Sequence, residues 1–248
     1  MSAPRRAVVI TGAGGTLGAV LASRFAGEPD TDVVLSDVSE ASLAATVAGL
    51  PNARGAVETV LADVSEIEQV EAVVAQAVER FGKVDALISN AGVLAPNGRI
   101  HNLTTDDWER SLRVNVLGAV NNIRAVVPVM RAQKSGSIVL TASVAGMTAW
   151  SHAAPYCATK AAVIQLAKVA AVEYARDGIR VNCVCPGTFL SGIHADLPQE
   201  AIDAIAVKHP LGLGTPADLV GAYSYLAGDA SAWTTGAALV VDGGYAAP

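Results

Sequence analysis

Short, uninterrupted apolar runs alternate with longer helical patterns along almost the whole of this chain. A fully apolar run fits a parallel strand that is covered on both faces, because a half-exposed strand would alternate apolar and polar residues. Parallel strands need crossover connections, and the helices between them supply these. The alternation therefore predicts an α/β fold, a Rossmann-type doubly wound parallel sheet of about seven strands flanked by helices.

The expected elements follow from these runs. The expected strands are Ala7–Thr11, Asp32–Ser36, Val57–Leu61, Ala86–Ser89, Ser137–Thr141, Arg180–Val184 and Ala238–Val241. The expected helices are Leu17–Ala26, Glu40–Gly49, Ile67–Phe81, Thr105–Arg131, Pro155–Arg176 and Ala217–Ala227. No internal repeat, low-complexity tract or linker divides the chain, so we expect a single domain over residues 1–248.

Composition and charge narrow the possible functions. The net charge is −6, and no dense Lys/Arg run supplies the basic footprint that nucleic-acid binding needs. No apolar segment reaches the roughly 18 residues that a membrane span requires. The segment Met1–Arg6 leads directly into a short apolar strand, without the long apolar region of a signal peptide. We therefore expect a soluble, cytoplasmic protein with no nucleic-acid or membrane partner.

The chain has three cysteines, Cys157, Cys183 and Cys185, so they cannot all form disulfides within one chain. Cys183 and Cys185 alternate within an apolar run, which places them on the same face of a buried strand. We interpret all three as reduced thiols in the core of a cytosolic protein and expect no metal site.

A glycine-rich turn, TGAGGTLG over Thr11–Gly18, follows the first expected strand. Glycines let the backbone approach a pyrophosphate, and a helix that begins near Thr16 or Leu17 supplies free N–H groups and the positive end of its dipole. Strand, turn and helix together predict a dinucleotide site. The candidate residues in this turn are Gly12, Gly15, Thr16 and Leu17.

Asp37 comes at the end of the second expected strand, 19 residues after Gly18. A carboxylate there can accept hydrogen bonds from both adenosine ribose hydroxyls and repels a 2′-phosphate. No Lys or Arg lies within Ala13–Leu17, or directly after Asp37, to bind such a phosphate. The sequence therefore favours NAD over NADP; the alternative is that Asp37 is a turn residue or the N-cap of the helix after Ser39.

Two further turns extend the candidate dinucleotide site. Asp63 follows the third expected strand, where it is placed to bind the adenine amino group while Val64 packs on the ring. The alternative for Asp63 is an N-cap of the helix that begins near Glu66. The segment Asn90–Gly92 ends the fourth expected strand, and its small residues let the backbone lie along the cofactor ribose; the alternative is an ordinary strand-ending turn.

Tyr156 and Lys160 are four residues apart on an expected helix, so their side chains share one face. An ammonium beside a phenol favours the phenolate and lowers the tyrosine pKa from roughly 10 toward values useful for proton transfer. Ser143 lies thirteen residues upstream of Tyr156. A Tyr–Lys pair alone is common on surface helices, but together with Ser143 and the nucleotide turn it predicts a catalytic site.

Taken together, these motifs resemble the short-chain dehydrogenase/reductase family, in its shorter, single-domain subfamily. The resemblance covers essentially the whole chain, from Thr11 to the Val241–Gly244 segment. The residues that carry it are Asp63, Asn90, Ala91, Gly92, Asn115, Ser143, Tyr156, Lys160, Pro186 and Gly187.

The chain departs from the subfamily's pattern at three places. Thr16 stands where the usual TGxxxGxG turn has glycine, and Gly15 gives TGxxGxxG, the arrangement of the longer, epimerase-type members. The chain lacks the extra substrate domain of those members. The other departures are Ser89, where a further Asn is common, and Ser191, where Thr usually contacts the nicotinamide carboxamide.

The resemblance implies that NAD lies across the carboxyl ends of the strands and that a hydride passes between nicotinamide and a carbinol carbon. Tyr156 would exchange the hydroxyl proton, Lys160 would lower the Tyr156 pKa and bind the nicotinamide ribose, and Ser143 would bind the substrate oxygen. Asn115 would hold a water that links Lys160 to solvent. The remaining expected cofactor contacts are Pro186, Gly187, Phe189 and Ser191.

The residues expected to face the substrate form a mainly apolar set: Val93, Leu94, Ala145, Met147, Trp150, His152, Phe189 and His194. Because we expect no Arg or Lys at the mouth beyond Arg99, the resemblance and this set predict an alcohol dehydrogenase or ketoreductase for a neutral, moderately apolar secondary alcohol or ketone. The segment Phe189–His209 is a candidate lid, or else a plain connection with one helix.

Two other functions stay open. One is NAD-bound epimerase or lyase chemistry on the same fold, which the altered glycine turn favours. The other is a non-catalytic NAD-sensing protein, against which the complete set of Ser143, Tyr156 and Lys160 argues. The apolar helices Thr105–Arg131 and Pro155–Arg176 indicate self-association, and the resemblance implies a homotetramer.

Overall fold

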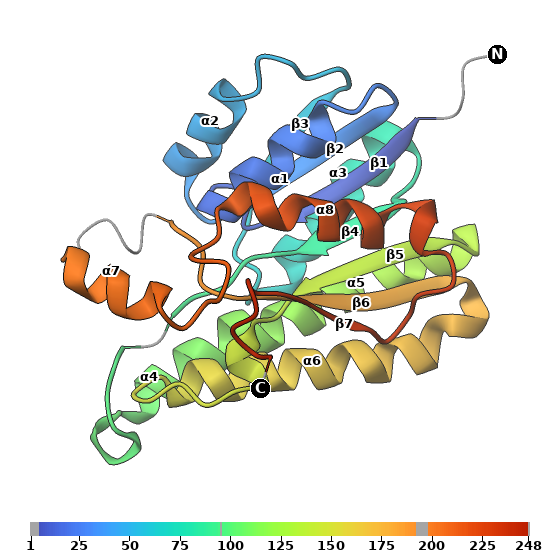
Figure 1. Cartoon of the computed structure of the whole chain (residues 1–248). Helices are drawn as coiled ribbons and strands as arrows, with labels where there is room; N and C mark the ends of the chain where they lie inside the picture. The colour runs from blue at the N-terminus through green and yellow to red at the C-terminus, as the bar shows by residue number, and fades with distance from the viewer. Residues whose placement is uncertain (1–4, 95, 192–197, 248) are drawn as a thin grey trace.

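Seven parallel strands form one sheet in the order β3-β2-β1-β4-β5-β6-β7 (Figure 1). The structure, a computed structural model, describes residues 5–94, 96–191 and 198–247. The strands are β1 (Arg6–Thr11), β2 (Thr31–Asp37), β3 (Val57–Leu61), β4 (Ala86–Ser89), β5 (Gly136–Thr141), β6 (Ile179–Pro186) and β7 (Ala238–Val241). The strand order reverses between β1 and β4, and a crevice for ligands is expected at the carboxyl ends of the strands at such a point.

Helices cover both faces of the sheet (Figure 1). One face carries α1 (Thr16–Ala26), α2 (Glu40–Ala48) and α8 (Pro216–Ala227), and the other carries α3 (Ile67–Phe81), α5 (Gly118–Gln133) and α6 (Ala154–Tyr174). The shorter α4 (Thr105–Ser111) and α7 (Gln199–Ala206) lie beyond the carboxyl ends of the strands. Short 3₁₀ turns cover Ile100–Asn102, Val144–Gly146, Ala175–Asp177 and Asp229–Ser231.

Two hydrophobic layers form because successive side chains of each strand point to opposite faces. Val9 of β1 packs among the residues of α3, α5 and α6, whereas its neighbours Val8 and Ile10 pack against α1 and α8. All three side chains are fully buried. Burial on both faces explains why the strands read as unbroken apolar runs.

The α/β class, the parallel sheet and its seven strands are confirmed. Strand boundaries differ from the expected ones by at most two residues; the largest difference is at β6, which continues to Pro186. The expected helix over 105–131 is interrupted by a π-helical turn, Leu112–Leu117, between α4 and α5. Cys183 and Cys185 are buried free thiols, as expected, whereas Cys157 is only partly buried and is not part of the core.

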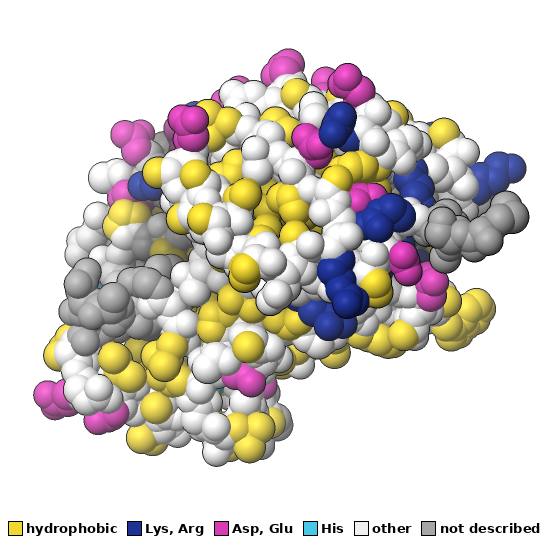
Figure 2. Space-filling model, turned by 90° about the horizontal axis from the view of Figure 1, so that it is seen from above, with side chains coloured by type: hydrophobic (Ala, Val, Ile, Leu, Met, Phe, Trp, Pro, Cys, Tyr) yellow, Lys and Arg dark blue, Asp and Glu magenta, His cyan; other side chains and the backbone are white. Residues whose placement is uncertain are grey.

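Charged and apolar side chains are mixed on the surface, and Lys and Arg gather toward one end of the view in Figure 2. Near the start of β1, Arg5 pairs with Asp32 at 2.8 Å and Arg6 pairs with Glu28 at 3.4 Å. These arginines therefore bind carboxylates of the same chain.

Candidate active site

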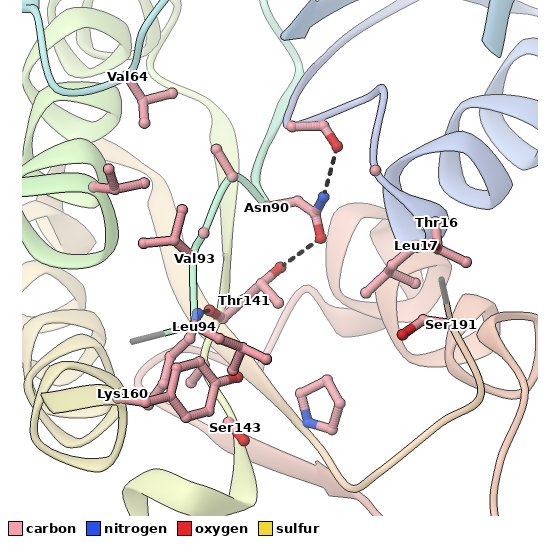
Figure 3. A pocket seen from close by; sticks show the side chains of 18 of the residues that line it. Thr16, Leu17, Val64, Asn90, Val93, Leu94, Thr141, Ser143, Lys160 and Ser191 are labelled. Carbon is pink, nitrogen blue, oxygen red and sulfur yellow. Dashed lines mark hydrogen bonds between the residues drawn. The ribbon is translucent and has the colours of Figure 1, made fainter. Parts of the chain in front are cut away.

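A cavity of about 1140 Å³ opens at the carboxyl ends of the strands and gathers side chains from distant parts of the chain (Figure 3). The expected site residues that line it are Gly12, Gly15, Thr16, Leu17, Asp37, Asp63, Val64, Asn90, Ala91, Gly92, Ser143, Tyr156, Lys160, Pro186, Gly187, Phe189 and Ser191. Asn115 does not line the cavity. The expected nucleotide and catalytic residues thus share one space.

The glycine turn packs closely against its neighbours at three positions. Gly12 has φ +67°, and a Cβ there would lie 2.6 Å from Cα of Ala91. A Cβ on Gly14 would lie 2.7 Å from Cβ of Ser42. At Gly15 a Cβ would meet only the Gly12 carbonyl, at 3.4 Å. At Gly18 a Cβ would clash with the Gly12 carbonyl and lie 2.8 Å from Cα of Ala13. Packing within the protein therefore requires glycine at 12, 14 and 18, and much less at 15; the requirement at 14 was not expected from the sequence.

Helix α1 begins at Thr16, as expected, and its first turn borders the cavity. Its N-cap, Gly15, makes no side-chain hydrogen bond to the first-turn amides. Free N–H groups and the positive end of a helix dipole suit an anionic group. The turn therefore fits the pyrophosphate of a dinucleotide.

Asp37 lies at the end of β2 on the cavity wall. Its Oδ2 accepts the Gly14 N–H at 2.9 Å, and its Oδ1 accepts the Ser39 N–H at 3.0 Å. Each carboxylate oxygen keeps capacity for another donor, so ribose hydroxyls fit there. The N-cap of α2 is Ser39, whose Oγ accepts the Ser42 N–H at 3.2 Å.

Asp63 also lines the cavity and is not the N-cap of α3. Its Oδ1 accepts the Ser65 N–H at 2.8 Å, while the N-cap position belongs to Glu66, which makes no side-chain cap bond. The neighbouring Val64 is held by its carbonyl, which accepts Nδ2 of Asn121 at 2.9 Å. The Asp63 carboxylate thus shapes its own turn at the cavity edge.

Lys160 is buried beneath the cavity, with 4% of its surface exposed. Its Nζ donates to the Thr141 carbonyl at 2.7 Å and lies 5.6 Å from the centre of the Tyr156 ring. Burial lowers the pKa of Lys160 from 10.5 to about 8, while Cys185 and Cys183 act in the opposite direction. The hold of a main-chain carbonyl of β5 on this ammonium has no signal in the sequence.

Tyr156 differs from the sequence-based expectation. Burial raises the pKa of its phenol above 10.0, and a hydrogen bond with Ser143 only partly offsets this. The expected lowering by Lys160 is therefore not seen, because desolvation disfavours the phenolate and the ammonium alike. Ser143 is itself buried, and its Oγ accepts the Ala145 N–H at 3.1 Å.

Asn115 lies within the π-helical turn Leu112–Leu117, a feature frequent at functional sites. Its side chain exchanges two hydrogen bonds with the backbone of Val93, at 2.8 and 3.0 Å, and donates to Oγ1 of Thr159 at 3.1 Å. Asn115 thus links the segment after β4 to the helix of Tyr156 and Lys160.

The substrate end of the cavity has an aromatic wall that only partly matches the expected set. Trp150 stacks on Tyr156, with ring centroids 6.1 Å apart, and Tyr245 meets Trp150 edge-on at the same distance. Val93, Leu94 and Phe189 also line the cavity. Tyr245 was not expected, since it follows two glycines near the end of the sequence and belongs to no periodic pattern.

Three residues expected at the substrate end do not line the cavity. Ala145 is buried in the turn after Ser143, because the Val144–Gly146 turn packs against α6. Met147 is 53% exposed, and His152 is exposed with Nδ1 2.8 Å from Oγ of Ser151. His194 lies outside the described residues.

The expectation of a mouth without basic residues other than Arg99 was wrong. Arg99 does not line the cavity, but Arg110, Arg113 and Lys208 do. Arg110 is on α4, and Arg113 is in the π-helical turn that follows it. Arg113 pairs with Glu66 at 2.8 Å. Lys208 follows α7. Folding brings these elements over the strand ends, which the linear spacing did not indicate.

Comparison with known proteins identifies the family. A family model described as enoyl-(acyl carrier protein) reductase, from the short-chain dehydrogenase/reductase family, matches residues 12–246. The chain belongs to the short-chain dehydrogenase/reductase family. Members of this family bind a nicotinamide dinucleotide. Because the named relatives are hydroxy-group dehydrogenases and reductases, the chain is an enzyme, an oxidoreductase.

Its relatives in this family are dehydrogenases and reductases. Cis-4-hydroxycyclohexanecarboxylate dehydrogenase of Sinomonas cyclohexanicum is 35% identical over 98% of this chain and 97% of its own length. Meso-2,3-butanediol dehydrogenase of Serratia marcescens is 35% identical over 96% of this chain and 94% of its own. The structure of an NAD⁺-bound xylitol dehydrogenase superposes with a TM-score of 0.92 at 30% identity, covering 98% of this chain and all of that one.

Within the described ranges, no helix has both the length and the apolar character needed to cross a bilayer. The same ranges contain no cluster of three or more His, Cys, Asp or Glu side chains arranged to hold a metal ion.

The buried ammonium of Lys160 predicts a pH-dependent stability for the cofactor-free enzyme. The folded-state pKa of about 8 lies below 10.5, so between these values the unfolded chain binds more protons and stability rises with pH. From pH 7.5 to 9.5 we expect this residue to add about 2 kcal/mol to the free energy of unfolding. Urea denaturation at fixed protein concentration measures it, and Lys160→Met should lack the increment. Equal pH slopes in both proteins would contradict the expectation.

Proposed function

We propose that this enzyme is an NAD-dependent oxidoreductase that interconverts a secondary alcohol and a ketone, with Tyr156 as acid and base. The observation that carries the proposal is the grouping of Ser143, Tyr156 and Lys160 on the wall of the cavity that also holds the glycine turn. Ser143 acts on Tyr156 by opposing part of the rise in its pKa, and Nζ of Lys160 lies 5.6 Å from the centre of the Tyr156 ring.

Side chains of this protein transfer the proton of the substrate hydroxyl. Tyr156 removes the hydroxyl proton during oxidation and returns it to the carbonyl oxygen during reduction. Ser143 donates a hydrogen bond to the same oxygen and stabilises the charge that develops there. Lys160, fixed by the Thr141 carbonyl, places a positive charge near the phenolate that forms. Hydride transfer is the chemistry that a nicotinamide coenzyme would supply when it is bound at the glycine turn.

Asp37 supports NAD rather than NADP as the coenzyme. Its carboxylate lines the cavity and is bonded to the Gly14 N–H of the glycine turn, where it would accept the ribose hydroxyls and repel a 2′-phosphate. Arg110 and Arg113 also line the cavity, but Arg113 is paired with Glu66. We therefore propose NAD as the preferred coenzyme. We also propose that Asn115 supports the active-site helix through its bonds to Val93 and Thr159.

The substrate is proposed to be neutral and moderately apolar. Trp150, Tyr245, Leu94 and Phe189 give the pocket next to Tyr156 a flat, apolar lining, which suits a ring or a short carbon chain bearing the hydroxyl. The relatives named for 2,5-dichloro-2,5-cyclohexadiene-1,4-diol and for meso-2,3-butanediol have neutral alcohols in their names, which supports this class, whereas the one named for cis-4-hydroxycyclohexanecarboxylate has a ring alcohol that carries a carboxylate.

A panel of alcohols tests the proposal. Cyclohexanol, cis-4-hydroxycyclohexanecarboxylate, meso-2,3-butanediol and xylitol are incubated with NAD or NADP at pH 9, and NADH or NADPH is followed by absorbance. We expect cyclohexanol and butanediol to react with NAD faster than xylitol does. If the enzyme co-purifies with NAD yet forms no NADH with any alcohol, epimerase or lyase chemistry is favoured. Absence of both binding and turnover would reject the enzyme proposal.

Self-association is part of the proposal. Exposed apolar side chains lie in the π-helical turn and on α6, at Leu112, Leu117, Val169 and Val172, and Val172 is 81% exposed. Exposed apolar side chains mark an interaction surface where they form one contiguous patch. We propose a homo-oligomer in the cytoplasm, with four copies as the family resemblance implies.

A further inference from the structure

A partly buried chain of hydrogen bonds runs along the carboxyl ends of the strands from α8 to the glycine turn, and the proposed mechanism makes no use of it. Tyr223 on α8 is fully buried, and its Oη lies 2.8 Å from Oγ1 of Thr141. That hydroxyl lies 3.4 Å from Oδ1 of Asn90, and Nδ2 of Asn90 donates to the Gly12 carbonyl at 3.0 Å. Figure 3 shows the Asn90 amide between these two partners.

The donors in this chain can be arranged in only one order. Asn90 donates to a carbonyl through Nδ2, so its Oδ1 must accept from Thr141. The Thr141 hydroxyl has a single proton, which this bond uses, so Tyr223 must be the donor to Thr141. Burial raises the pKa of Tyr223, which keeps the phenol protonated and able to donate throughout the neutral range.

Thr141 connects this chain to the catalytic lysine. Its carbonyl oxygen accepts Nζ of Lys160 at 2.7 Å. Thr141 is the last residue of β5. The pairing of β5 with β4 ends one residue before it, at Leu140 opposite Ser89. On that side, the Asn90 and Tyr223 side chains therefore hold the strand end in place of a neighbouring strand.

We propose that Tyr223 and Thr141 are positioning residues, whose hydroxyl–hydroxyl bond fixes the end of β5 and with it the carbonyl that holds the Lys160 ammonium beside Tyr156. The inference rests on the proposed function of Tyr156 and Lys160. Tyr223 touches neither substrate nor coenzyme, since it does not line the cavity. Its effect on the reaction passes through Thr141.

The pH profile of turnover is a suitable readout. The titratable groups that act on Lys160 and Tyr156 are Cys157 on α6, Cys183 and Cys185 on β6, and Tyr223, which interacts electrostatically with Tyr156. Thr141→Val removes none of these groups. A shift of the pH profile in Thr141→Val therefore reports a change in the position of Lys160 relative to Tyr156, and Tyr223→Phe is interpreted beside it.

The experiment compares Tyr223→Phe, Thr141→Val, Thr141→Ser and the double variant Tyr223→Phe/Thr141→Val, with cyclohexanol and NAD as the probe pair. Tyr225→Phe is the matched control, because this tyrosine is on the same helix and its hydroxyl is bonded to Thr234 near the surface. We expect Tyr223→Phe to lower kcat about fivefold, the rate equivalent of one hydrogen bond. The pH at the midpoint of the rise in kcat toward alkaline pH should shift by about half a unit.

The other variants separate positioning from general destabilisation. Thr141→Ser, which keeps the hydroxyl, should retain more activity than Thr141→Val, and the double variant should be no slower than Thr141→Val alone. NADH affinity by fluorescence titration should stay near the wild-type value in Tyr223→Phe. Tyr225→Phe should keep wild-type kcat and profile.

Three results would overturn the inference: an unchanged kcat and profile in Tyr223→Phe, losses that add in the double variant, or an equal loss in Tyr225→Phe. If Tyr223→Phe fails to fold, the contrast between Thr141→Ser and Thr141→Val decides. Failure of the proposed function is distinguishable, because Tyr156→Phe would then keep its activity, whereas failure of this inference alone leaves Tyr156→Phe inactive.

Discussion

Tyr156→Phe is expected to lower kcat about a thousandfold, within the range that a positioned acid–base group contributes. The substitution removes only the phenol oxygen, so the ring still packs on Trp150. NADH affinity should therefore stay within about twofold of wild type, a change below 0.5 kcal/mol. Turnover is followed by NADH absorbance and binding by NADH fluorescence.

Tyr174→Phe is the control for this variant. Tyr174 is the last residue of the same helix, α6, and packs against the hydrophobic core away from the cavity. Its loss of a hydroxyl should leave kcat unchanged. Retention of most activity in Tyr156→Phe would reject Tyr156 as the acid–base group, and an equal loss in Tyr174→Phe would point to damage of the helix.

Asp37→Ala is expected to reduce the preference for NAD over NADP about a hundredfold. The preference is measured as kcat/KM with NAD divided by kcat/KM with NADP. Repulsion between a carboxylate and a nearby doubly charged 2′-phosphate, once it is largely screened by water and salt, costs about 2–3 kcal/mol, which corresponds to about a hundredfold in the ratio. The structure adds a second effect, since the carboxylate accepts N–H groups of Gly14 and Ser39. Both coenzymes should bind more weakly once the turn loses these bonds.

Asp37→Asn separates the two effects because it removes the charge and keeps a polar side chain. It should relax the preference almost as far as Asp37→Ala. Asp30→Asn is the charge control, since Asp30 directly precedes β2 at the opposite end of that strand, and its ratio should match wild type. An unchanged ratio in both Asp37 variants would move coenzyme selection to another part of the cavity.

The sheet and its helices could be read from the sequence because their signals are local. Each strand is an unbroken apolar run, and Pro155 in the first turn of α6 marks the start of that helix. The catalytic spacing from Tyr156 to Lys160 is likewise one helical turn. Such features depend on neighbours within a few residues, and a sequence displays them directly.

The features that were missed depend on contacts between distant segments. Tyr223 meets Thr141 across 82 positions, and Asn115 meets Val93 across 22. The upward pKa shift of Tyr156 is a consequence of burial, which no spacing reveals. The basic residues at the mouth, such as Lys208, were missed because they approach the cavity only when α4 and α7 fold over the strand ends.

Because the Lys160 ammonium is bound by a main-chain oxygen, the identity of residue 141 is free to vary while the anchor persists. Exchanges at this position, and at its partner Tyr223, are accordingly expected to adjust turnover gradually. Replacing the lysine removes the anchored group altogether. Saturation libraries at these two sites should therefore give enzymes with a range of kcat values. They are also a route to shifting the pH optimum while Tyr156 and Lys160 are kept.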